Sequence, residues 1–207
     1  MNEKKYSPAC ERNRAPILEK LKHYFDTVQE VLEIGSGTGQ HAVFFAQHLP
    51  HIHWYTSDRD ENHSSIQAWI EETELPRIHS PYSLDVKSAW PERLFDAAFT
   101  ANTCHIMAWD EVICMFNGLS RHINTDGLLV IYGPFNYLGQ YTSPSNEAFD
   151  HSLQNQAPHM GLRDFEKIKD LGAHCGFELV ADHDMPANNR LLVFKKTTNT
   201  SALNKSV

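Results

Sequence analysis

The sequence predicts an α/β protein built on a doubly wound, mostly parallel sheet. Apolar segments of strand length alternate with amphipathic segments of helix length through five strand–helix alternations. A glycine-rich turn follows the first strand, and two further strand-like segments close the chain. Strands that alternate with helices pair in parallel, because each helix carries the chain back to the starting edge of the sheet.

The first segment combines a polar arm with an amphipathic helix. Apolar residues at helical spacing follow Pro16, and they are Ile17, Leu18, Leu21, Tyr24 and Phe25. We therefore expect an extended arm that turns into a helix after Pro16, with residues 1–27 forming part of a lid over a pocket. The polar residues before the helix, Glu11, Arg12, Asn13 and Arg14, have a second interpretation as its solvated start.

The remaining elements are apolar runs of strand length or segments with apolar residues at helical spacing. In order, they are strand 28–34, helix 39–49, strand 52–57, helix 60–73, strands 77–84 and 95–101, helix 109–122, strand 127–132, helices 146–155 and 162–174, and strands 177–182 and 190–195. The short joint at residues 184–189 predicts that the last two strands form an antiparallel hairpin.

Proline and glycine residues define several of these boundaries. Pro50 ends the second helix, and Gly176 is a C-terminal cap for helix 162–174. Pro81 has no N–H to donate to a neighbouring strand, so we expect strand 77–84 at an edge of the sheet. Residues 133–145 form a long loop rich in Gly, Pro, Asn and Tyr, which predicts a functional role.

The composition fits one globular domain, which we expect to span residues 1–196 of the 207, before a disordered tail at residues 197–207. The 18 basic and 26 acidic residues give a net charge of −8 without a basic block, which argues against a nucleic-acid partner. The start of the chain lacks the apolar core of a signal peptide, and no apolar run approaches the ~20 residues of a membrane-spanning helix. We therefore expect a soluble cytoplasmic protein with no membrane partner.

Cysteine and histidine residues do not form a recognisable metal site. The four cysteines lack a Cys-x-x-Cys pair, which favours reduced thiols. Two histidine pairs, His51 with His53 and His41 with His48, lie at spacings that share one face of a strand or helix, but neither pair has a third ligand nearby in the sequence. We expect no metal.

The glycine-rich turn carries the strongest functional signal. Gly35, Gly37 and Gly39 let a ligand lie close to the main chain, and Glu33 adds a carboxylate at the end of the strand. An anion there disfavours a pyrophosphate and favours a cation such as a sulfonium. A dinucleotide turn would also have its third glycine at position 40, where this chain has Gln40. The pattern therefore predicts a methyl-donor site rather than a nicotinamide site.

Four longer segments extend this motif into a family resemblance. Residues 33–39 resemble the first motif of class I S-adenosylmethionine-dependent methyltransferases, whose seven-stranded sheet ends in a reversed strand. Residues 7–13, 101–107, 132–136 and 185–189 are similar to a group of small methyltransferase-like proteins of unknown function. The similarity reaches Lys196 and implies S-adenosylmethionine as the cofactor.

The resemblance implies a role for each strand end. Glu33 would hold the positive methionine end, directly or through water. Asp58 would bind the ribose hydroxyls and Asp85 the adenine amino group, with Asn102 and Thr103 beside the methionine half. Taken alone, Asp58 could instead cap the following helix, and Asp85 could be a turn residue. The expected cofactor-binding residues are Glu33, Gly35, Ser36, Gly37, Thr38, Gly39, Asp58, Arg59, Leu84, Asp85, Val86, Asn102 and Thr103.

Substrate-side candidates lie beyond the carboxyl ends of the strands, where doubly wound sheets bind ligands. They are Arg12, His105, Trp109, Tyr132, Asn136 and Asn188. His105 is the candidate proton acceptor, although a histidine there can simply cap or pack. We expect methyl transfer to a small-molecule acceptor. The alternative is a non-catalytic module that binds S-adenosylmethionine or S-adenosylhomocysteine and acts through a protein partner.

Overall fold

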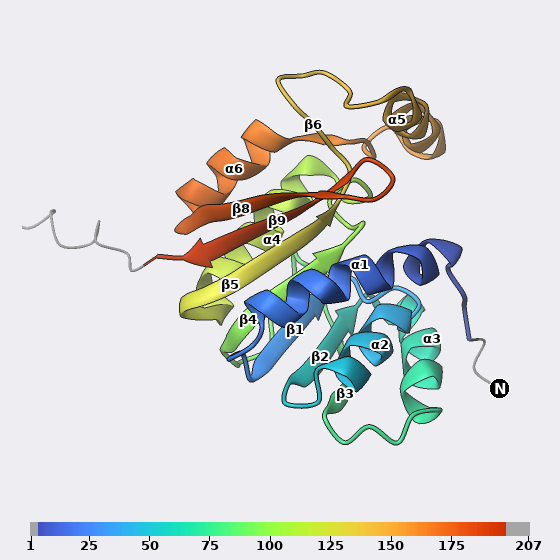
Figure 1. Cartoon of the computed structure of the whole chain (residues 1–207), viewed down its shortest axis with the longest axis vertical. Helices are drawn as coiled ribbons and strands as arrows, with labels where there is room; N and C mark the ends of the chain where they lie inside the picture. The colour runs from blue at the N-terminus through green and yellow to red at the C-terminus, as the bar shows by residue number, and fades with distance from the viewer. Residues whose placement is uncertain (1–3, 198–207) are drawn as a thin grey trace, which may run out of the picture.

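Strands and helices alternate along the chain as the sequence predicts (Figure 1). The computed structural model describes residues 4–197. Its elements are α1 (Pro8–Tyr24), β1 (Glu30–Ile34), α2 (Gln40–His48), β2 (His53–Asp58), α3 (Asp60–Glu71), β3 (Ile78–Ser83), β4 (Phe95–Ala101), α4 (Trp109–His122), β5 (Ile123–Gly133), β6 (Phe135–Asn136), α5 (Pro144–Gln156), β7 (Arg163–Asp164), α6 (Phe165–His174), β8 (Phe177–Met185) and β9 (Asn189–Lys196). The predicted tail lies, apart from Thr197, outside the described residues.

The main sheet has seven strands in the order β3-β2-β1-β4-β5-β9-β8. Strands β1 to β5 pair in parallel, whereas β9 pairs antiparallel with both β5 and β8. The predicted hairpin and the reversed strand are therefore confirmed, and β3 lies at the edge that Pro81 indicated. The chain order reverses between β1 and β4, so the carboxyl ends of these two strands flank a crevice.

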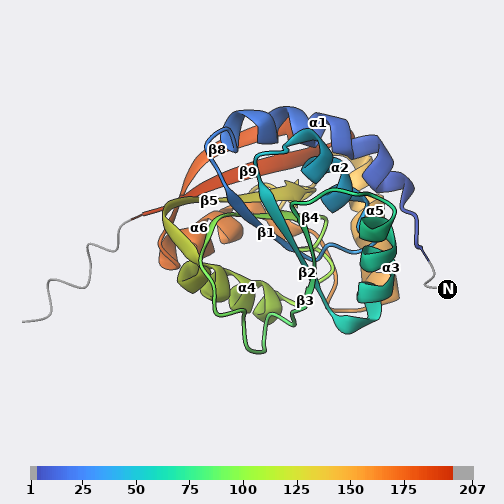
Figure 2. The same cartoon turned by 90° about the horizontal axis from the view of Figure 1, so that it is seen from below.

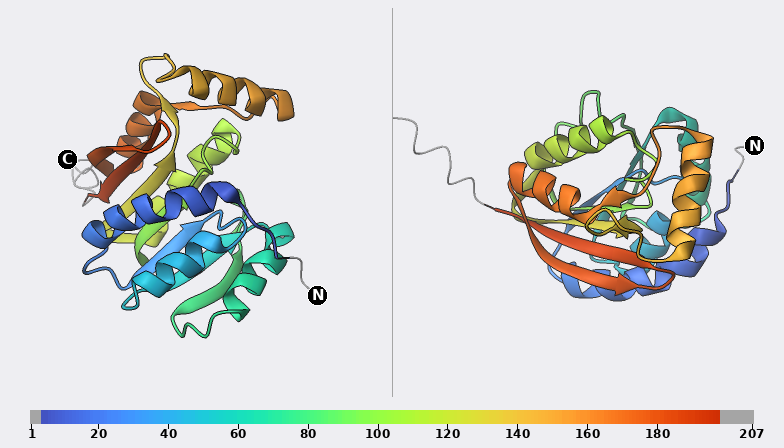
Figure 3. Two further views of the ribbon diagram at one scale, coloured as in Figure 1. Left: turned by 45° about the vertical axis from the view of Figure 1, so that its right-hand side comes forward. Right: turned by 90° about the horizontal axis from the view of Figure 1, so that it is seen from above.

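Helices cover both faces of the sheet (Figures 2 and 3). Helices α1, α2 and α3 pack on one face, in a core centred on the rings of Phe45, Trp54 and Phe99. Helices α4 and α6 pack on the other face, around Phe116 and Phe194. None of the helices within residues 4–197 combines the length and the hydropathy that crossing a membrane requires.

Helix α1 begins earlier than the sequence predicts. Residues 8–16, expected as an extended arm, are helical, because the Ser7 side chain accepts a hydrogen bond from the Cys10 amide and Pro8 occupies the first turn. Pro16 lies inside the helix although it cannot donate to the Arg12 carbonyl. On the C-terminal side of Pro16, the buried side chains of Ile17, Leu18 and Leu21 hold the helix against the sheet.

The segment after β5 is more ordered than a loop. Strand β6 pairs in parallel with β7 in a separate two-stranded sheet, and α5 starts from Ser143, whose hydroxyl accepts from the Asn146 amide. Helix α5 lies across one end of the molecule (Figure 3, right). The prediction of an irregular loop over residues 133–145 is therefore wrong in its structure, because a short strand and a capped helix start within it.

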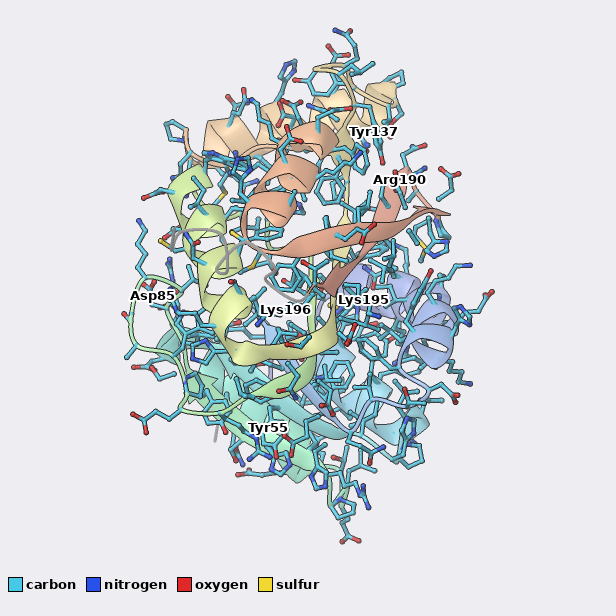
Figure 4. The ribbon with its side chains drawn as sticks, turned by 90° about the vertical axis from the view of Figure 1, so that its left-hand side faces the viewer. Tyr55, Asp85, Tyr137, Arg190, Lys195 and Lys196 are labelled. Carbon is cyan, nitrogen blue, oxygen red and sulfur yellow. The ribbon has the colours of Figure 1, made fainter. Side chains whose placement is uncertain are left out.

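Polar contacts fix both ends of the terminal hairpin. Tyr137 donates to Asp182 over 2.8 Å, and the Arg190 Nε donates to the other carboxylate oxygen of Asp182 over 2.7 Å. Figure 4 shows Tyr137 and Arg190 near one end of the hairpin and Lys195 and Lys196 towards the other. The Lys196 ammonium donates to the carbonyls of Ser120 and Ile123, which ties β9 to the C-terminal end of α4.

Candidate active site

The three glycines of the turn have positive φ angles but different surroundings. A Cβ on Gly35 would lie 3.0 Å from the Thr103 side chain, and one on Gly39 would lie 2.9 Å from the Ile66 Cα. These two glycines let the turn pack against the loop after β4 and against α3. Gly37, at φ +58, has open space on its Cβ side and lines two cavities. Gly35 lines the same cavities, but Gly37 is the glycine whose Cβ side leaves room for a ligand.

One of these cavities, of about 840 Å³, lies beyond the carboxyl ends of β1 to β4, and we call it the acidic cavity. Its acidic side chains are those of Asp58, Glu61, Asp85, Asp110 and Glu111. The predicted cofactor residues that line it are Gly35, Gly37, Asp58, Arg59, Leu84, Asp85, Val86, Asn102 and Thr103. Nine of the thirteen predicted cofactor-binding residues therefore meet in this cavity.

Asp58 connects the end of β2 to the glycine turn. Its Oδ2 accepts from the Gly37 amide over 2.7 Å, and its Oδ1 accepts from the Asn62 side chain over 3.0 Å. The alternative role as a helix cap is wrong, because the N-cap of α3 is Arg59 and no side chain caps that helix. Asp58 instead holds the turn in place while it lines the cavity.

The basic residues of the acidic cavity are paired with acids. Arg59 contacts Glu111 at 2.9 Å and Asp85 at 3.9 Å, and Lys87 contacts Asp110 at 2.7 Å. Asp85, on the loop after β3 (Figure 4), also accepts from the Lys87 amide over 2.9 Å. Asp85 therefore has the turn contact that the alternative interpretation proposed, and it lines the cavity as well. Since the cations are paired, the cavity keeps an excess of negative charge.

Glu33 does not line either cavity. Its Oε2 accepts from the Ser36 hydroxyl over 2.9 Å and from the Trp54 indole over 3.1 Å, beneath the turn. Burial raises the pKa of Glu33 to about 7, and these hydrogen bonds offset part of that effect. The predicted contact between Glu33 and a ligand, directly or through water, stays a prediction, because the side chain lies beneath the turn and accepts from the buried indole N–H. Gly39 likewise lines neither cavity and serves packing instead.

A second cavity, of about 710 Å³, adjoins the first, and we call it the histidine cavity after His41 and His105. The residues that line both cavities are Gly35, Gly37, Ala101, Asn102 and Ile106. The predicted residues that line the histidine cavity without touching the acidic one are Arg12, Ser36, Thr38, His105 and Tyr132. The two cavities thus adjoin at the glycine turn and at the loop after β4.

His105 is a buried, neutral histidine of the histidine cavity. Its side chain is 5% exposed and makes no hydrogen bond to a residue within 4–197, while its ring lies edge-on to Phe149. Burial, helped by the nearby Arg163 guanidinium, lowers the pKa of His105 to about 4. Arg163 also donates to the Cys104 carbonyl over 2.9 Å, which holds the loop after β4. His105 therefore packs, as the alternative proposed, but its ring remains available as a proton acceptor.

The histidine cavity is lined by further polar residues that the sequence did not predict as site residues. The His41 Nε2 lies 2.6 Å from the Asn13 Oδ1, and burial lowers the pKa of His41 to about 4. The neutral ring therefore donates its Nε2–H to Asn13. Asn146 and Phe149 of α5 also line this cavity. These residues could have been identified as polar side chains on the buried face of an amphipathic helix, because such side chains need a hydrogen-bond partner or a cavity.

Three predicted substrate-side residues line neither cavity. Trp109 packs into the core from the first turn of α4, and Asn136 lies in β6 with a buried Oδ1 that has no partner within the described chain. Asn188 donates to the Ser145 hydroxyl over 3.1 Å and accepts from Asn146, and so ties the β8–β9 turn to α5. These residues lie at the expected end of the sheet, but their side chains face neighbouring elements.

The histidine pairs considered as metal ligands bind other partners. His48 and His51 contact the carbonyls of Phe44 and Phe25, and His53 contacts His79. Across residues 4–197, no three His, Cys, Asp or Glu side chains meet as metal ligands could.

Solved structures share the fold over most of this chain. An O-methyltransferase family protein from Burkholderia thailandensis has a TM-score of 0.81 at 14% identity, covering 92% of this chain and 58% of that chain. An O-methyltransferase family 2 protein from Planctomyces limnophilus, solved with apigenin, has a TM-score of 0.81 at 14% identity, covering 91% and 58%. The S-adenosylmethionine-dependent methyltransferase SibL, in its apo form, has a TM-score of 0.79 at 16% identity, covering 92% and 56%. The fold is therefore class I methyltransferase-like, and this chain spans a little over half the length of these proteins.

A family model covers nearly the whole described chain. It matches residues 4–196 and carries the description "Protein of unknown function (DUF938)". The match extends from before α1 to the last residue of β9, and so includes both cavities. The chain belongs to the DUF938 family of proteins of unknown function.

Proposed function

We propose that the protein binds S-adenosylmethionine in the acidic cavity and transfers its methyl group to a small molecule in the histidine cavity. The observation that carries this proposal is the junction of the two cavities at Gly37, with carboxylates on one side and a buried neutral histidine on the other. A donor and an acceptor bound in two such adjoining cavities can approach each other in line.

The residues of the acidic cavity fit this cofactor. Its volume of about 840 Å³ lies within the range of about 300–1,000 Å³ that is typical of small-molecule sites. Asp58 offers carboxylate oxygens to a ribose, and the apolar side chains of Leu84 and Val86 offer a surface to a flat ring. Gly37 leaves open the space that a Cβ would fill.

When bound, S-adenosylmethionine supplies a sulfonium-activated methyl group, so that the acceptor bonds to the methyl carbon as the carbon–sulfur bond breaks and leaves its electron pair on sulfur. His105 would accept the acceptor's proton on a ring nitrogen. Burial keeps the ring neutral at pH 7, and the lowered pKa of about 4 also makes it a weaker base than an exposed histidine. Helix α1 and α5 would help to exclude water, since their first turns line the histidine cavity. Solved neighbours named as O-methyltransferases support a hydroxyl as the acceptor group.

A pair of glycine variants tests the cofactor site. Gly37→Ala and Gly139→Ala both place a Cβ at positive φ, +58 and +70, where neither meets a close neighbour. Both variants should lose about 1 kcal/mol of folding stability from backbone strain. We expect that calorimetry detects weaker S-adenosylhomocysteine binding in Gly37→Ala, because Gly37 lines both cavities and Gly139 lines neither. Equal affinities in the two variants would remove the turn from the binding site.

Two further measurements separate the alternatives. Calorimetry of the wild type should show binding of S-adenosylmethionine and S-adenosylhomocysteine but not of NAD; the reverse pattern would indicate a nicotinamide enzyme. A labelled-methyl screen against small-molecule extracts should then yield a labelled product. Cofactor binding without any labelled product would favour a non-catalytic module that acts through a protein partner.

A further inference from the structure

The two cavities differ in the charge that lines them. The acidic cavity contains five carboxylates and two cations, each of which pairs with a carboxylate. The described residues that line the histidine cavity include no Asp or Glu, and their charged member is Arg12. The two histidines of this cavity are neutral at pH 7, because burial lowers the pKa of each to about 4.

Arg12 is an exposed cation without an ion-pair partner within residues 4–197. On the same helix, Arg14 pairs with Glu11 and lies over the Phe44 ring. Arg12 lies one turn after the N-cap residue Ser7, and both residues line the histidine cavity. Its guanidinium therefore keeps its donors free for a ligand, and a planar fork of donors matches a carboxylate.

Two helices add to the positive potential of this cavity. The first turns of α1 and α5 both line it, through Ser7 and Cys10 on one side and Ser145 and Asn146 on the other. The N-terminus of a helix carries roughly half a positive charge. Among the described residues that line this cavity, an ammonium group would meet Arg12 and these helix ends but no carboxylate. Glu33 lies beneath the turn, and its pKa of about 7 leaves it only partly charged at pH 7.

The apolar side chains of this cavity suit an apolar ligand body with one polar group. Ile106 and Phe149 are both partly exposed and line its wall. His105, which has no hydrogen-bond partner for its ring within the described residues, lies against Phe149. Tyr132 is also buried there, and burial raises the pKa of its hydroxyl. A ligand hydroxyl beside these side chains would have His105 as its acceptor.

We propose that the histidine cavity binds an acceptor that carries a carboxylate, held by Arg12, and presents a hydroxyl to His105. This assignment rests on the proposed function, because it identifies the chemical class of the acceptor in that reaction. A carboxylate also occurs on the amino-acid end of S-adenosylmethionine, so the test must separate these two sources.

The test uses a panel of small hydroxy acids with matched analogues. Each acid, 4-hydroxybenzoate among them, is paired with its methyl ester and with the amine that replaces its carboxylate. Binding is measured by calorimetry on protein saturated with S-adenosylhomocysteine. We expect at least one acid to bind about tenfold more tightly than its ester and amine, the scale of one charge-assisted contact. The proposal would be overturned if every panel member bound equally well as acid and as ester. It would also be overturned if none of the acids bound.

Variants of Arg12 assign the contact. Arg12→Gln should remove the preference for the acid, Arg12→Lys should restore part of it, and Arg14→Gln should leave it intact because Arg14 does not line the cavity. Unchanged binding of S-adenosylhomocysteine shows that the variants are folded. If Arg12→Gln weakens S-adenosylhomocysteine but not 5′-methylthioadenosine, which lacks the amino acid, Arg12 binds the cofactor and the proposal is wrong. If the wild type binds no S-adenosylhomocysteine, the proposed function itself fails.

Discussion

A carboxyl group beneath the glycine turn couples proton binding to folding. Glu33 is 2% exposed, and burial raises its pKa to about 7 from 4.5. Between these two values the native state binds more protons than the unfolded state. The free energy of unfolding therefore decreases as the pH rises from about 4.5 to about 7 and stays lower above that range.

Glu33→Gln should remove this dependence. The variant keeps an oxygen for the Trp54 indole and the Ser36 hydroxyl, and it carries no charge to desolvate. At pH 8 we expect it to be more stable than the wild type by roughly 1–3 kcal/mol, and this advantage should vanish near pH 4.5. Urea unfolding at both pH values measures the difference, with the exposed Glu19→Gln as the control. An equal loss of stability at both pH values would contradict the raised pKa.

The residues of the acidic cavity were predictable because parallel strands end at a common edge. Asp58 ends one such strand, and Asp85 and Asn102 follow two others, so their sequence positions determine their meeting place. Asn13 and His41 lie on two different helices, and the sequence does not determine how far such helices extend over the strand ends. Only the structure brings this pair together, at 2.6 Å.

At the scale of the element, periodicity predicted which helices exist better than where they begin. The apolar residues of α1 start at Ile17, which placed its start after Pro16, but the cap at Ser7 extends it back to Pro8. The polar residues between Pro8 and Ile17 line the histidine cavity or pair with each other. They therefore add no apolar residues at helical spacing. Helix α4 was predicted at both ends because its apolar residues span its full length.

The packing of α4 depends on a glycine in its interior. A Cβ on Gly118 would lie 2.1 Å from the ring of Trp90, which covers the helix from the loop after β3. Gly118→Ala should therefore destabilise the protein by about 1–3 kcal/mol, although alanine favours helices by about 1 kcal/mol. Chemical denaturation measures the change. Arg121→Ala, at an exposed position of α4, is the control and should change stability little.

A double variant checks the cause of this effect. In a Trp90→Ala background the steric conflict is absent, so Gly118→Ala should be neutral or stabilising by up to about 1 kcal/mol. Additive losses in the double variant would mean that Trp90 is not the obstacle.

For the whole molecule, the reversal of strand order places cavity-lining residues in both halves of the sheet. The acidic cavity takes residues from the ends of β1, β2 and β3 on one side and of β4 on the other. The histidine cavity adds α1, α5 and the β8–β9 turn. A ligand that spans both cavities contacts segments from the start to the end of the described chain. Its binding should therefore stabilise the native state as one unit.

Thermal unfolding measures this stabilisation. At a concentration of 100 times its dissociation constant, S-adenosylhomocysteine should stabilise the wild type by about 2.7 kcal/mol. For a domain of this size, that corresponds to a rise in Tm of roughly 5–11 °C. Asp58→Ala should weaken binding by roughly 1–3 kcal/mol, the scale of a lost buried hydrogen-bonding partner. For a tenfold loss, the stabilisation at the same ligand concentration falls to about 1.4 kcal/mol.

Asp60→Ala is the matched control, because its side chain is 81% exposed, two residues away, and lines neither cavity. It should keep the full shift with S-adenosylhomocysteine, and NAD should shift neither variant. Asp58→Ala also frees the Gly37 amide, so its effect combines lost ligand contact with a looser turn. Asp58→Asn, which keeps an acceptor for that amide but removes the charge, separates the two. An equal Tm shift in Asp58→Ala and Asp60→Ala would remove Asp58 from the binding site.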